Sequence, residues 1–154
     1  MLAFSKTARN VIRKFWRHLT KRPNIPLETL RIVPVVAPLA RPNRWSRGLI
    51  GERPVRSVNA ALYVTNITGI PVRLVAAYLK RPRTEAIMFT SEHRDADQGG
   101  LPLLPGETLE VECMFAVEPS PSDDDAGVFT AKVLLIDQFG NRHVSRRIEF
   151  HSAG

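Results

Sequence analysis

The sequence predicts a mainly β protein: an antiparallel β-sandwich of about seven strands, preceded by an N-terminal basic amphipathic α-helix and a proline-rich extended connector. Three observations predict it. Apolar residues recur at a helical period in residues 1–22, prolines crowd residues 23–54, and apolar and polar residues alternate in short runs over residues 55–151, before a tail at 152–154. With 154 residues, 44% of them apolar, the chain can bury one core of ordinary size.

The predicted helix covers residues 1–22. A step of about 100° per residue separates an apolar face from a basic face. Pro23 ends the helix, because proline disfavours helical backbone at the residue before it. The apolar face offers Phe4, Val11, Ile12, Phe15, Trp16 and Leu19 to a partner or a membrane, and the basic face carries Arg9, Arg13, Lys14, Arg17 and Lys21.

The net charge of +7 belongs to this helix. Residues 1–22 hold seven basic residues and no acid, which equals the whole excess. Residues 57–154 hold nine basic and thirteen acidic residues, a balance of −4. We therefore expect an anionic partner to meet the N-terminal third of the chain.

The connector, residues 23–54, is too rich in proline for a long helix or a central strand. Residues 31–37 could still add an edge strand, where a proline is tolerated. Further along, Trp45 stands among arginines that include Arg44 and Arg47. This cluster could pack on its own domain, contact a protein partner as an interface aromatic with basic neighbours, or bind nucleic acid, in that order.

Alternation of apolar and polar residues predicts the strands of the sandwich. It is clearest over 109–117, where Leu109, Val111, Cys113, Phe115 and Val117 point inward. The stretch 72–79 is apolar at nearly every position, which is typical of a strand covered on both faces. The remaining strands are expected at 58–65, 86–90, 129–135 and 143–150, with turns at 66–71 and 138–141.

Three short segments punctuate these strands: Tyr63-Val64-Thr65-Asn66, Leu104-Pro105-Gly106-Glu107 and Asp137-Gln138-Phe139-Gly140-Asn141. Their order resembles a bacterial version of the immunoglobulin-like sandwich over about the last hundred residues. The resemblance implies an accessory or interaction domain, and no functional residues transfer with it. The core tryptophan and paired cysteines of antibody domains are absent, since Cys113 is the only cysteine.

No motif predicts catalysis, a cofactor or a metal. Asp95–Gly100 begins like a calcium loop, but Gly99 and Gly106 stand where that loop needs ligands. The histidines occur without metal-ligand spacing. We therefore expect a chain that is not an enzyme, and an enzyme built on His93, Asp95 and Asp97 stays as an alternative.

The expected function is a non-enzymatic interaction or scaffolding module, tethered by its helix to a larger protein assembly or to an anionic membrane surface. The alternatives are a nucleic-acid-binding accessory protein that uses residues 1–56, a mitochondrial protein with a cleaved presequence, and a helix that packs on its own sandwich. The expected location is the cytoplasm, including the inner face of a membrane, with the mitochondrion as the alternative. No stretch of about 18 apolar residues predicts a membrane span.

Overall fold

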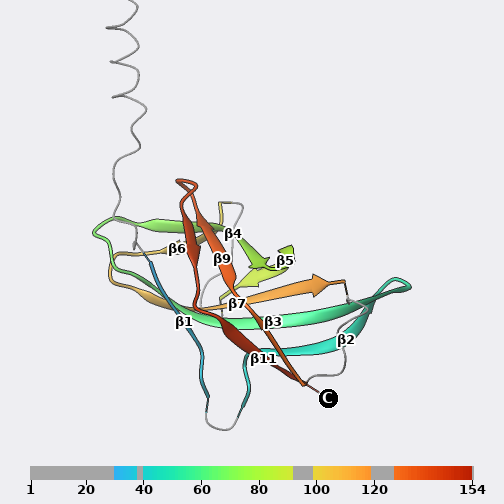
Figure 1. Ribbon diagram of the computed structural model, residues 1–154. Coiled ribbons are helices and arrows are strands. Elements are labelled where there is room, and N and C mark those ends of the chain that lie inside the picture. The colour runs from blue at the N-terminus through green and yellow to red at the C-terminus, as the bar shows by residue number, and fades with distance from the viewer. Residues whose placement is uncertain (1–29, 38–39, 92–98, 119–126, 154) are drawn as a thin grey trace, which may run out of the picture.

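A computed structural model describes residues 30–37, 40–91, 99–118 and 127–153 (Figure 1). The predicted helix over residues 1–22 lies outside them. Within the described residues every regular element is a β-strand, which confirms the mainly β class. The strands are β1 (Leu30–Pro34), β2 (Arg44–Ile50), β3 (Arg53–Asn66), β4 (Val72–Lys80), β5 (Arg83–Thr90), β6 (Leu101–Leu103), β7 (Thr108–Val117), β8 (Val128–Ala131), β9 (Val133–Asp137), β10 (Arg142–Val144) and β11 (Ile148–Ser152).

The strands pair into one curled sheet in the order β10-β9-β4-β5-β7-β3-β2-β11-β8, with β1 added to β3 and β6 added to β4. Adjacent strands are antiparallel except β2 and β11, which are parallel. The sheet curls because several strands change neighbours along their length: β5 pairs with β4 by its first residues and with β7 by its last. An immunoglobulin-like sandwich stays a prediction.

Two stretches of chain, β8–β9 and β10–β11, cross from one part of the sheet to the other. Only Lys132 separates β8, which pairs with β11, from β9, which pairs with β4. Residues 145–147 likewise separate β10 from β11. The single strand expected at 143–150 is thus two strands, because the chain bends where it leaves one set of neighbours for another. In Figure 1 the orange-red β9 and the red β11 run diagonally across β3, and β11 continues beside β2.

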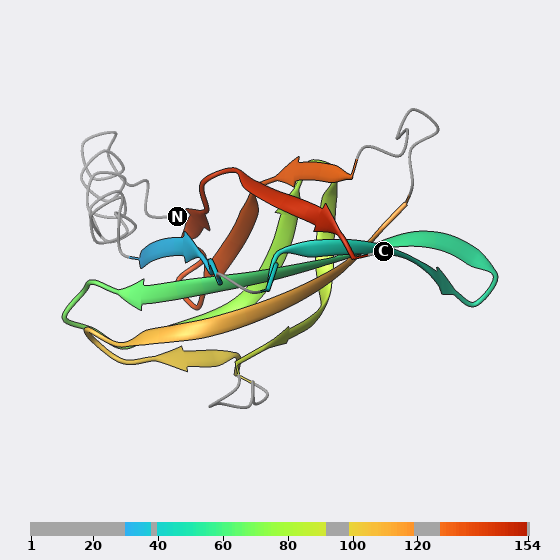
Figure 2. The same ribbon diagram turned by 90° about the horizontal axis from the view of Figure 1, so that it is seen from below.

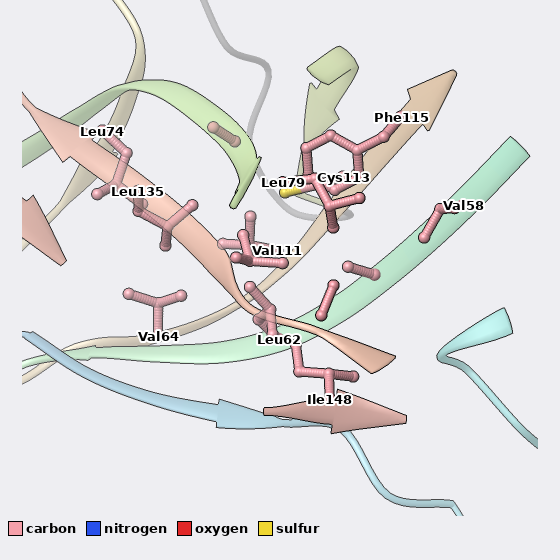
Figure 3. Close-up of a cluster of buried hydrophobic side chains, with 14 of the residues drawn as sticks. Val58, Leu62, Val64, Leu74, Leu79, Val111, Cys113, Phe115, Leu135 and Ile148 are labelled. Atoms are coloured by element: carbon pink, nitrogen blue, oxygen red, sulfur yellow. The ribbon is translucent and has the colours of Figure 1, made fainter. Parts of the chain in front are cut away.

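The core fills the inside of the curl (Figure 3). The alternation predicted for β7 is confirmed, since its five inward residues are all at most 5% exposed. The expectation for residues 72–79 is wrong: β4 alternates too, and Val75 is 45% exposed beside a break in the strand register. The largest fully buried side chains are Phe115, Phe150, Leu62, Leu74, Leu79, Leu101, Leu103 and Leu135.

Among the described residues the sheet begins at Leu30, not near residue 55, because the expected connector contributes two strands. The expected edge strand is present as β1, and β1 and β2 lie one after the other along the same edge of β3. Asn43 joins them: its Nδ2 donates to the Val35 carbonyl at 3.1 Å, and the Ala61 N–H donates to its Oδ1 at 2.9 Å. Trp45 is the only buried residue of β2, so this strand lacks the alternation of buried and exposed residues by which a strand can be predicted.

No helix among the described residues is long and apolar enough to cross a membrane.

Candidate functional site

Of the predicted contact residues, the structure describes only Arg44, Trp45 and Arg47, all on β2; the others belong to residues 1–22 and lie outside the described residues. Arg44 and Arg47 are exposed. Because successive side chains of a strand point to opposite faces, these two arginines lie on opposite faces of β2. They do not form one basic surface.

Trp45 is only 5% exposed and belongs to the core. The Arg56 guanidinium carbon lies 4.6 Å from the centre of the Trp45 ring and 5.3 Å from that of Phe129, so the cation is held between two aromatic faces. Phe129 in turn packs against Phe150, with ring centres 5.6 Å apart. This arrangement agrees with local packing, the interpretation ranked first, and leaves Trp45 almost no surface for a partner.

Arg56 is the member of this stack that sequence reasoning missed. It is 9% exposed although it is charged. A signal was present, because Arg56 is in phase with the inward residues Val58 and Ala60 of β3. Cation–π contact compensates part of the cost of burying the guanidinium.

The most exposed apolar residues on a projecting element are Leu49 and Ile50, at 70% and 52% exposure. They lie at the tip of the β2–β3 hairpin, whose turn Gly51 allows with a φ of 61°. Strand β7 pairs with β3 only as far as Arg56, so the hairpin continues past it as a two-stranded ribbon. Figure 2 shows this teal ribbon extending away from the rest of the sheet.

Near the tip of the ribbon, an exposed ion pair joins Arg53, which pairs with Ile50 of β2, to Glu118, the residue that follows β7. Exposed pairs of this kind contribute little to stability. No other strand of the described chain pairs with the tip, and its two large apolar side chains are available to a partner.

A buried pair of ionisable residues lies at the β9–β10 turn. The Asp137 Oδ2 lies 2.9 Å from the His143 Nε2, and the side chains are 1% and 5% exposed. Because an ionised carboxylate only accepts hydrogen bonds, Nε2 carries the proton. The other oxygen accepts from the Phe139 and Asn141 N–H groups at 2.9 and 3.0 Å, so the carboxylate organises the turn.

Burial alone would raise the pKa of Asp137, but the hydrogen bonds from His143, Asn141 and Phe139 outweigh it and hold the pKa below its ordinary value. The carboxylate therefore stabilises the fold above the unfolded-state pKa of about 3.9, and this stabilisation is lost as pH falls through the lower folded-state pKa.

We expect Asp137→Asn to lower the free energy of unfolding at pH 7 by about 2 kcal/mol, because the hydrogen bonds to a charged carboxylate are lost. In addition, the NH₂ group of the new asparagine would face other hydrogen-bond donors. Below about pH 4 the variant should lose stability less steeply than the parent. Urea denaturation at several pH values measures both effects. Glu52→Gln, at the exposed hairpin turn, should change stability at pH 7 by less than about 0.5 kcal/mol. An unaltered acid slope in Asp137→Asn would contradict the assignment.

Cys113 faces the core, as its place in the alternation predicts, and is 1% exposed. Burial raises the pKa of its thiol to about 12, with the Glu112 carboxylate adding to the rise. The thiol stays protonated at neutral pH and packs as a small apolar side chain. No group of three or more His, Cys, Asp or Glu residues in the described part of the chain is placed to hold a metal ion.

The sequence matches no protein-family model. It also matches no curated protein at a significant level. Among solved structures it is similar to a copper-bound PCuAC domain from PmoF2, with a TM-score of 0.42 and 13% identity over 83% of this chain and 95% of that one. At that TM-score, neither a ligand nor a function can be transferred from that domain to this chain.

Proposed function

We propose that the chain is a non-enzymatic interaction module, an immunoglobulin-like domain that residues 1–22 tether to a larger protein assembly. The observation that carries the proposal is the β2–β3 hairpin, which holds Leu49 and Ile50 at its exposed tip. Apolar side chains that project from a domain can enter a pocket of a partner, where their burial contributes to binding.

The tether rests on the charge and periodicity of the N-terminal residues. An amphipathic helix with Phe4, Phe15 and Trp16 on one face fits the groove of a protein partner. Its basic face suits an acidic rim around that groove. The chain would then contact its assembly at two places, the helix and the hairpin tip, and the two contacts together would bind more tightly than either alone.

The test compares capture of partners by the tagged full chain, a variant lacking residues 1–22, and Leu49→Asp/Ile50→Asp. Each change should weaken association with the same partner at least tenfold, which is about 1.4 kcal/mol. Circular dichroism should show that both variants keep their β-structure. Ile87→Asp, which changes an exposed apolar residue at 59% exposure on β5, serves as the matched control and should bind normally.

Association that survives both changes would refute the interaction proposal. Binding of the full chain to anionic vesicles, lost on deletion of residues 1–22 and unaffected at the hairpin, would assign the tether to a membrane instead. Binding to nucleic acid that falls steeply with salt would favour the accessory role of residues 1–56.

A further inference from the structure

A second surface, unrelated to the helix and the hairpin, lies where the chain bends between β8 and β9 and between β10 and β11. There the strands separate around a hollow of about 230 Å³. A backbone hydrogen bond holds together the segments that line the hollow: the Lys80 N–H donates to the Lys132 carbonyl at 2.9 Å. The hollow is lined by Lys80, Arg81, Thr130, Ala131, Lys132 and Arg147.

The lining is strongly basic. The described residues that line the hollow include four cations and no acid, and none of the four forms an ion pair with another described residue. The concentration is unexpected in this part of the chain, because residues 57–154 carry thirteen acidic and only nine basic residues. Four of those nine surround one hollow. Like charges around one hollow repel one another, and a bound anion would relieve that repulsion.

The groups present suit phosphate. Two arginines offer planar pairs of N–H donors that match phosphate oxygens, two lysines offer compact positive charges, and the Thr130 hydroxyl adds a neutral donor. Among the described residues no aromatic side chain lines the hollow, so none of them would stack there on a nucleobase. Four cations also favour a multiply charged anion over a single carboxylate.

We propose that this hollow, which we name the basic hollow, binds the phosphate group of a small molecule or of a lipid headgroup. The four cations come from three separate places in the sequence, the end of β4, the β8–β9 bend and the start of β11, and only the crossing strands bring them together. The proposal does not depend on the interaction module proposed above.

Calorimetry with the full chain and inorganic pyrophosphate, at constant ionic strength, tests the site. We expect saturable binding of one pyrophosphate per chain. Lys132→Ala/Arg147→Ala should weaken it at least tenfold, and both residues are exposed, so the fold should be kept. The matched control is Arg142→Ala/Arg146→Ala, which removes the same charge from exposed positions outside the lining and should bind as the parent does.

Two further measurements distinguish the sources of the phosphate. Vesicles of phosphatidylcholine containing a phosphorylated phosphatidylinositol should bind through the basic hollow if the ligand is a lipid headgroup, and Lys132→Ala/Arg147→Ala should release them. Binding of soluble pyrophosphate or inositol phosphate without binding of vesicles assigns a free small molecule. Either result supports the site.

The proposal is overturned if pyrophosphate does not bind, or if the control variant loses as much affinity as the lining variant. A third outcome concerns Asp123, Asp124 and Asp125, which precede β8 outside the described residues. If pyrophosphate binds only after these three are changed to asparagine, the chain's own acids fill the basic hollow, and the proposal fails.

Discussion

Gly100→Ala should lower the free energy of unfolding by about 4 kcal/mol or more, a loss that few single substitutions reach. Gly100 has a φ of 98°, where an L side chain is strained, and a Cβ there would lie 2.2 Å from the Leu74 carbonyl oxygen. That oxygen belongs to the backbone of β4, so it cannot swing away as a flexible side chain could. Relief would require β6 to separate from β4.

Thermal and urea denaturation measure the effect, and the melting temperature should fall by about 10 °C or more. Gly69→Ala is the matched control, because a Cβ there meets nothing within 4 Å and its φ lies outside the strained range. The control should stay within about 1 kcal/mol of the parent. Equal stability of the two variants would show that β4 and β6 approach less closely than the structure has them.

Asn66→Ala should cost about 3 kcal/mol, because it removes a fully buried amide that makes four hydrogen bonds. Its Nδ2 donates to the carbonyls of Ile70 and Leu103 at 2.8 and 3.1 Å. Its Oδ1 accepts from the N–H and the hydroxyl of Thr68 at 3.0 and 2.6 Å. The side chain thus ties the β3–β4 turn to β6.

Asn66→Asp separates this hydrogen-bonding role from packing. The aspartate has nearly the same shape, but one carboxylate oxygen would face the Ile70 and Leu103 carbonyl oxygens, so the loss at pH 7 should be at least as large as for alanine. Asn59→Ala, on the half-buried outer face of β3, should cost less than about 1 kcal/mol. A small effect of both Asn66 variants, measured by urea denaturation, would contradict the network.

The period-two alternation made β3 and β7 predictable from sequence alone. Their inward residues, such as Val58, Leu62 and Val111, are buried because a strand with one face on a core must place every second side chain there. The turn at 138–141 was predictable from its residue types, and Gly140 takes the positive φ of 78°. Asn141 does not; it bonds to the Asp137 carboxylate instead.

Strands without such a pattern were missed or misjudged. Strand β2 has Trp45 as its single buried residue, and β6 is only three residues long, too short for alternation to show. The apolar run in β4 was interpreted as buried on both faces, yet Val75 is exposed. Composition cannot separate these cases, because an exposed valine and a buried one look alike in sequence.

By itself, then, the sequence determined the β class, the inward faces of the long strands, the main turns and the separation of a basic N-terminal segment from the net acidic residues 57–154. Only the tertiary structure decided where strands cross, how far the β2–β3 hairpin projects and that Lys80, Lys132 and Arg147 meet around one hollow. The physical reason is the distance along the chain over which each effect acts. Alternation and turn preferences act between neighbours in the chain, whereas pairing partners are chosen by packing between residues far apart in it.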